Sequence, residues 1–135
     1  MQKESYKAQE IVSGPGALQE AVQIVKNLGA QNILAVCSKS ARRHCGEDFW
    51  REFPGKVVFF HEFSPNPKYE EVEAGLALYE KEQCGMILSM GGGSAMDVAK
   101  CIKMFMPMDP DENYLKQEKK ASDIAHIAIP STAGT

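Results

Sequence analysis

Three consecutive glycines stand where an apolar run gives way to an amphipathic helix in the stretch MILSMGGGSAMDVAK, residues 86–100. Because glycine has no Cβ, backbone N–H groups at such a turn can approach a phosphate closely. The positive end of the following helix dipole would point at the same place. We therefore expect Gly92, Gly93 and Ser94 to form a cradle for a phosphate group.

Ser94 and Asp97 also have the spacing of a capping box, in which two side chains satisfy the first N–H groups of a helix. Both roles can hold at once. A cap alone does not require three glycines, since one suffices for a tight turn and each further one costs roughly 0.5–1 kcal/mol in regular structure. Phosphate contact is therefore the favoured interpretation, with the cap as the structural alternative.

A second glycine pair, in IVSGPGALQEA, competes for the phosphate-binding role. Gly14 and Gly16 follow an apolar run and imitate the opening of the dinucleotide fingerprint. Gln19 stands where the third glycine of that fingerprint belongs. This pair is the weaker of the two candidates.

The sequence offers no catalytic constellation and no metal site of its own. His44, His61 and His126 lack ligand-like spacing with one another or with cysteine and acidic residues. We assign each histidine to a surface or strand-end position. The four cysteines form no C-x-x-C pair and lie in or beside regular elements, which indicates reduced, inert thiols.

The elements that must position the glycines alternate between strands and helices. Strand-like runs, rich in β-branched and other apolar residues, cover residues 6–12, 32–37, 56–63, 86–90 and 125–129, with helical periodicity between them. Nearly continuous apolar strands joined by helices indicate an α/β, Rossmann-like fold: a mostly parallel sheet flanked by helices on both faces. Ligands of such folds bind beyond the carboxyl ends of the strands. Residues 107–123 are polar and broken by proline, which predicts a surface excursion.

Composition sets further limits. The chain has 135 residues, 44% of them hydrophobic and 24% charged, enough for one domain with a core. A net charge of −3 gives no reason to expect binding to nucleic acid or to an anionic membrane. The N-terminal residues lack the apolar core of a signal peptide, and no run reaches membrane-spanning length. We expect a cytoplasmic protein.

The motifs GGGSAMDVAK and, about thirty residues later, IAIPSTAGT resemble the group III, iron-dependent alcohol dehydrogenase family, whose pattern is GGGSxxDxAK followed by PTTAGTGSE. The segments IVSGPGAL and FSPNPKYEEVEAGL look like the FGxGA and PNPxxxxVExG motifs of that family. The resemblance extends over residues 1–135 and implies the N-terminal dinucleotide-binding domain only.

The resemblance also implies roles for individual residues. Gly93, Ser94 and Asp97 match the pyrophosphate-binding loop, and Asn66 matches the asparagine of the PNP turn near the cofactor. Ser131, Thr132 and Thr135 match the segment that lines the nicotinamide side, with Ser131 in place of the usual threonine.

For the complete enzyme, the family implies hydride transfer between NAD or NADP and a small aldehyde or alcohol. The metal, iron or zinc, is held there by one aspartate and three histidines of a helical C-terminal domain, which we expect to lie outside these 135 residues. A fainter resemblance points to the branch that acts on phosphonoacetaldehyde. The expected partners are thus the cofactor, the substrate and, in a homodimer, a second copy. The rival hypothesis is a non-enzymatic nucleotide-binding or interaction module.

Cofactor choice depends on the residues after the second strand. Many family members place an aspartate there for the adenosine ribose, whereas this chain reads CSKSARR, with Ser38 and Lys39. An acid would repel a 2′-phosphate, and a Ser/Lys/Arg cluster would attract one. The alternative is that Arg42 and Arg43 lie on a solvated helix face.

Overall fold

A computed structural model describes residues 10–130, which form one parallel sheet between two layers of helices. The sheet contains five strands in the order β1-β5-β4-β2-β3, and every neighbouring pair is parallel. The strands are β1 (Glu10–Ile11), β2 (Asn32–Cys37), β3 (Lys56–Phe60), β4 (Met86–Gly91) and β5 (Ala125–Pro130). The predicted α/β, Rossmann-like fold is confirmed.

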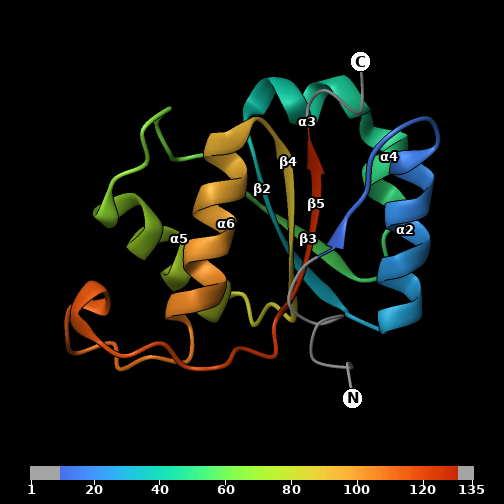
Figure 1. The fold of residues 1–135 in the computed structure, drawn as a ribbon. Helices are drawn as coiled ribbons and strands as arrows, with labels where there is room; N and C mark the ends of the chain where they lie inside the picture. Colours follow the sequence, from blue (N-terminus) through green and yellow to red (C-terminus); the bar gives the residue numbers. More distant parts are fainter. Residues whose placement is uncertain (1–9, 131–135) are drawn as a thin grey trace.

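Helices cover both faces of this sheet (Figure 1). On one face lie α5 (Tyr69–Lys81) and α6 (Gly93–Phe105); on the other lie α2 (Ala17–Leu28) and α4 (Glu47–Arg51). Successive strand residues point to opposite faces, so Ile33 and Ala35 join one core while Leu34 and Val36 join the other. Burial on both faces explains the continuous apolar strand sequences.

The order of the strands places a topological switch between β2 and β4. From β2 the chain moves outward to β3, and it then returns to the other side of β2 to form β4 and β5. In doubly wound sheets a ligand crevice opens at such a point, outside the carboxyl ends of the strands. The short helix α3 (Lys39–Cys45) lies at this same end of the sheet (Figure 1).

Residues 107–123 form the surface excursion that the sequence predicts, with one short 3₁₀ helix at Tyr114–Lys116. The excursion is anchored by Tyr114, whose ring stacks on Phe105 of α6 at 4.9 Å between centroids. Its backbone N–H donates to the hydroxyl of Tyr69 at 2.8 Å. This segment therefore packs on the α5–α6 layer.

Burial on α2 and the state of the cysteines can be compared with the sequence. On α2 the small residues Ala17 and Ala21 are buried against the sheet, whereas Leu28, the last residue of the helix, is exposed. All four cysteines are free, and burial raises the pKa of Cys37 to about 12. Within residues 10–130, none of the helices combines the length and apolar character that crossing a bilayer requires.

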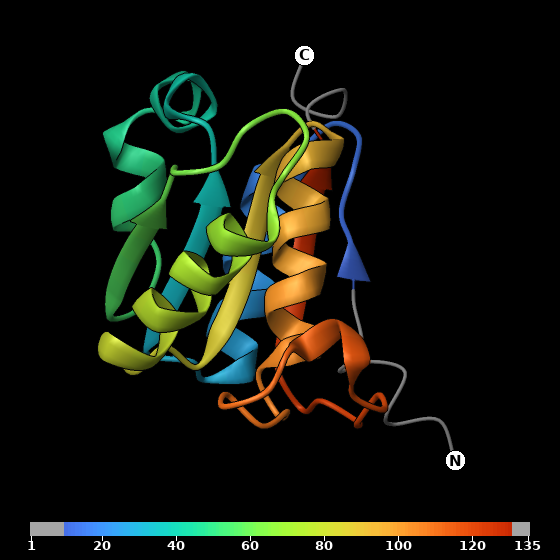
Figure 2. The ribbon, with the colours of Figure 1, turned by 90° about the vertical axis from the view of Figure 1, so that its left-hand side faces the viewer.

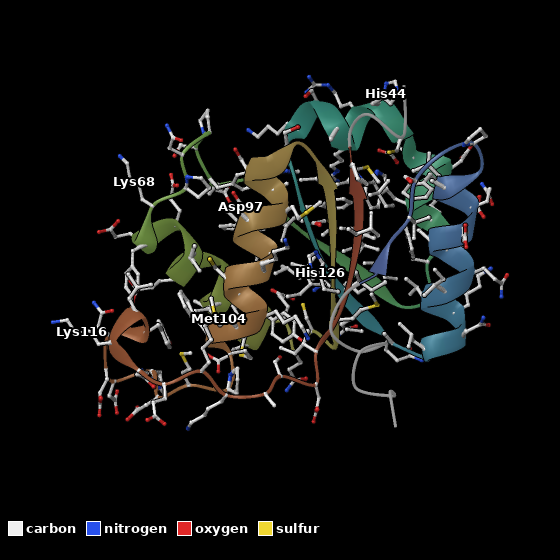
Figure 3. All side chains as sticks on the ribbon, in the orientation of Figure 1. His44, Lys68, Asp97, Met104, Lys116 and His126 are labelled. Carbon is white, nitrogen blue, oxygen red and sulfur yellow. The ribbon has the colours of Figure 1, made fainter. Side chains whose placement is uncertain are left out.

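One histidine departs from its expected position. His44 is exposed and His61 directly follows β3, but His126 is only 2% exposed and lies beneath α6 (Figure 3). Its Nε2 lies 2.8 Å from the hydroxyl of Ser89, and its Nδ1 has no partner among the described residues. Burial, reinforced by the positive charges of Lys103 and Lys100, lowers the pKa of His126 to about 4.

We predict that His126 makes the fold less stable in acid. The native pKa lies below the value of about 6.5 in an unfolded chain, so the unfolded state binds more protons between these two values. The contribution of neutral His126 should be full above pH 7 and decrease by roughly 2 kcal/mol on acidification to pH 5.

The measurement is urea unfolding of wild type and His126→Gln at pH 7 and pH 5. The acid-induced loss of stability should shrink in His126→Gln and remain in His44→Gln, the control on exposed α3. An equal loss in all three proteins would contradict the prediction.

Candidate functional site

The turn between β4 and α6 contains one glycine that the backbone requires and two that it does not. Gly91 has φ +123°, a conformation that favours glycine. Gly92 is extended, with φ −81°, and Gly93 is the first residue of α6. A Cβ added at Gly92 or Gly93 would meet no heavy atom of the described residues within 4 Å. These two positions are thus open to a ligand that approaches the backbone.

The start of α6 is suited to an anion. Gly92 is the N-cap residue and has no side chain with which to cap the helix. Ser94 lies inside the first turn, and its hydroxyl donates to the carbonyl oxygen of Pro65 at 2.6 Å. The capping box expected from Ser94 and Asp97 is therefore wrong, because the helix begins too early for Ser94 to cap it. Asp97 lies exposed near the start of this thirteen-residue helix.

The bond from Ser94 ties α6 to the loop that carries Asn66. Figure 2 shows this loop, which follows β3, reaching across the carboxyl end of the sheet to the start of α6. Asn66 is exposed and directly follows Pro65. The structure thus brings the PNP turn, through Pro65, into direct contact with Ser94.

The loop is held in shape by Glu71, a residue that the sequence analysis did not single out. Its carboxylate accepts hydrogen bonds from the N–H of Lys68 at 2.8 Å and from the N–H of Ser64 at 3.2 Å. These bonds, that of Lys68 first, lower the pKa of Glu71. The signal available in the sequence was a glutamate three residues after the residue that precedes the helix.

A hollow of about 350 Å³ opens beside the glycine turn, where β2, β4 and β5 end. Its lining combines backbone of the glycine turn with mostly apolar side chains, among them Leu18, Ala41, Met90 and Ile129. Ser38 also lines it, while its hydroxyl accepts from the N–H of Ala41 at 3.1 Å and so caps α3. Lys39 is exposed on the first turn of that helix and does not belong to the lining.

Arg42 is exposed on α3, in agreement with the solvated helix face, and its guanidinium also packs on an aromatic ring. Its guanidinium lies 3.6 Å from the centroid of the Phe59 ring, and its Nη1 is 3.5 Å from Nε2 of His61. The arginine thus packs on the aromatic residues at the end of β3. This contact depends on the pairing of β2 with β3, which brings the helix that follows β2 close to the end of β3.

The chain matches a known protein family. The model of the family described as "Iron-containing alcohol dehydrogenase" matches residues 8–135. This chain belongs to the iron-containing alcohol dehydrogenase family. It is 32% identical to methanol:N,N-dimethyl-4-nitrosoaniline oxidoreductase of Rhodococcus erythropolis over 98% of the chain and 33% of that protein. It is also 32% identical to 1,3-propanediol dehydrogenase of Klebsiella pneumoniae over 90% of the chain and 34% of that protein.

The fold has counterparts among solved structures. The crystal structure of sulfoacetaldehyde reductase from Bifidobacterium kashiwanohense in complex with NAD+ superposes with a TM-score of 0.69 at 23% identity. That match covers 93% of this chain and 45% of the other. The chain spans about a third of the length of the curated relatives given above.

The remaining candidate residues lie near the two ends of the chain. Ser131, Thr132 and Thr135 lie outside the described residues. Gly14 and Gly16 of the competing motif both have positive φ, and Gly16 is the N-cap of α2. In this chain these two glycines therefore form the turn from β1 into the helix. Among residues 10–130, no three histidine, cysteine or acidic side chains come together as metal ligands would.

We predict that Gly93→Val lowers the affinity of the chain for NAD(P)H at least tenfold. A side chain there fills the open space at the helix start and removes charge-assisted hydrogen bonds worth roughly 1.5–3 kcal/mol each. Calorimetric titration with NADH and NADPH measures the affinity, and thermal unfolding checks the fold.

The matched control is Gly85→Val, at a glycine before β4 where an added Cβ makes only an ordinary contact with Asn32. It should leave affinity unchanged. Equal affinity of wild type and Gly93→Val would show that the glycines serve the turn alone.

Proposed function

We propose that this chain is the dinucleotide-binding part of a metal-dependent alcohol dehydrogenase or aldehyde reductase. The observation that carries the proposal is the open glycine turn at the start of α6. Neither Gly92 nor Gly93 is required by a positive φ or by packing against the described residues, yet Gly92 lines the hollow at the topological switch and Gly93 directly follows it. A bound pyrophosphate accounts for both glycines.

The residues around the turn have distinct roles in this proposal. The N–H groups of Gly93 and Ser94 bind the pyrophosphate, aided by the positive end of the α6 dipole. The Ser94 hydroxyl, bonded to Pro65, and the Glu71 carboxylate hold the loop so that Asn66 borders the cofactor. Asp97, near the helix start, completes the family motif. The family resemblance assigns Ser131, Thr132 and Thr135, which lie outside the described residues, to the nicotinamide side.

The chemistry of the complete enzyme rests on parts beyond these residues. NAD(P) supplies or accepts the hydride that is exchanged with a small aldehyde or alcohol. The described residues do not fit iron or zinc, because they assemble no donor set. We therefore assign the metal ligands to a C-terminal helical domain. Phosphonoacetaldehyde remains the substrate suggested by the glycine motif.

We predict that the 135-residue chain alone binds no stoichiometric iron or zinc and turns over no alcohol or aldehyde. Metal analysis and a reduction assay with NADH and NADPH test this. Turnover should return when a C-terminal metal-binding domain of the family is supplied, whereas activity of the metal-free chain would contradict the proposed division of labour. Dinucleotide binding without turnover in the combined protein would favour a nucleotide-binding module instead.

Cofactor preference follows from the site beside Ser38. With the pyrophosphate at Gly92–Ser94, the adenosine ribose lies towards the end of β2, where Ser38 lines the hollow. The sequence from Ser38 to Gly46 contains no carboxylate to accept hydrogen bonds from both ribose hydroxyls. Lys39 instead offers a positive charge to a 2′-phosphate. We therefore expect NADPH to be preferred over NADH, although one solved relative is described as a complex with NAD+.

We predict at least a ten-fold preference for NADPH, because a charge-assisted contact is worth roughly 1.5–3 kcal/mol. Ser38→Asp should shift the preference towards NADH without loss of the α3 cap, since aspartate caps helices as well as serine does. Lys39→Asp should act in the same direction. The measurement is the affinity of each cofactor for each variant.

Ser38→Asn is the matched control, because it keeps the cap and adds no charge. It should leave the preference unchanged. A wild type that prefers NADH, or aspartate variants that behave like Ser38→Asn, would refute the assignment.

A further inference from the structure

A second hollow, of about 640 Å³, runs along β3 at the edge of the sheet. Val57 and Phe59 line it, which are alternate residues and therefore one face of the strand, together with Gly55 just before the strand begins. β3 pairs with β2 on one side and ends the sheet on the other. An edge strand presents backbone N–H and C=O groups that can pair with a further strand. We call this hollow the β3 groove.

The groove exists because the crossover from β2 to β3 is short. It contains only α3, of seven residues, and α4, of five. Trp50 of α4 forms the floor, with its indole N–H donating to the carbonyl oxygen of Arg42 at 3.0 Å. Its ring meets that of Phe59 edge to face at 4.9 Å between centroids. The floor is thus a rigid aromatic surface beside an open strand.

The rim of the groove is positive in a chain whose net charge is −3. Three arginines, Arg42, Arg43 and Arg51, line it together with one acid, Glu47. Arg51 pairs with Glu47 at 3.3 Å and with Asp48 at 3.4 Å, but all three side chains are largely exposed, so these pairs are weak and a ligand carboxylate can replace them. The planar guanidinium of Arg42 is held in place on Phe59.

We propose that the β3 groove docks an extended acidic segment of a partner protein, added to the sheet as a strand beside β3. Backbone hydrogen bonds to β3 supply the affinity, and carboxylates at alternate positions on the α4-facing side meet the three arginines. The methylene groups of those acidic side chains lie on Trp50 and Phe59. A second copy of this chain is a poor occupant, because symmetric pairing of two β3 strands brings the same arginines together.

The β3 groove is separate from the proposed cofactor site. Among the described residues, the two hollows share no lining residue. Docking of an acidic segment therefore does not compete directly with a dinucleotide, and a loss of peptide binding is distinguishable from a loss of cofactor binding.

The test uses the acetylated and amidated peptide TETETET with the 135-residue chain. Trp50 is the sole tryptophan, so its fluorescence reports on the groove without a label. We expect a saturable change in that fluorescence, and an affinity that falls as salt rises. Arg43→Glu should weaken binding at least tenfold. The control Lys116→Glu, a similar charge reversal beyond α5 and α6, should have no effect (Figure 3).

Two further peptides separate strand pairing from charge alone. A TETETET peptide with N-methylated alternate residues cannot complete the backbone ladder and should lose most of the affinity, and TKTKTKT should not bind. Equal binding of the N-methylated peptide, or of a thymidine heptanucleotide, would show a general anion surface and overturn the proposal. No fluorescence response to TETETET at millimolar concentration would overturn it too. A concentration-dependent dimer with the same Trp50 response would assign the groove to a second copy.

Discussion

The parallel pairing of β2, β4 and β5 is the constraint on which the rest of this structure depends. Parallel strands must be joined by crossovers, and the helices of these crossovers bury both faces of the sheet. All carboxyl ends then meet at one edge, so that the glycine turn after β4 lies beside the residues that follow β2 and the last two residues of β5. The candidate cofactor site is a direct consequence of strand direction.

Around this edge the loops are fixed by a few specific hydrogen bonds. Glu71 accepts from two backbone N–H groups of the loop before α5, and Ser94 donates to the carbonyl oxygen of Pro65 in the same loop. The first residues of α5 and α6 thereby hold one loop from two sides. A loop anchored in this way can present Asn66 without being buried itself.

The sheet has two chemically different regions where a ligand can form hydrogen bonds with backbone N–H or C=O groups. At the carboxyl edge, Gly92 and Gly93 expose N–H groups at the positive end of a helix, which suits an anion. Along β3, the backbone of an edge strand lies beside aromatic rings and arginines, which suits another chain. The short crossover through α3 and α4 leaves the second region open, while the switch between β2 and β4 creates the first.

The sequence alone determined the alternation of strands and helices and the glycine turn, because apolar periodicity and glycine act locally, but the strand expected over residues 56–63 ends at Phe60. It also carried the motifs of the iron-containing alcohol dehydrogenase family. Tertiary structure decided what those residues touch. The capping box failed because α6 begins at Gly93. Arg42 of α3 packs on Phe59 of β3, and His126 is buried with its ring 2.8 Å from the hydroxyl of Ser89. The contacts of Arg42 and His126 join residues 17 or more positions apart, and spacing along the chain carries no information about which distant side chains the sheet brings together.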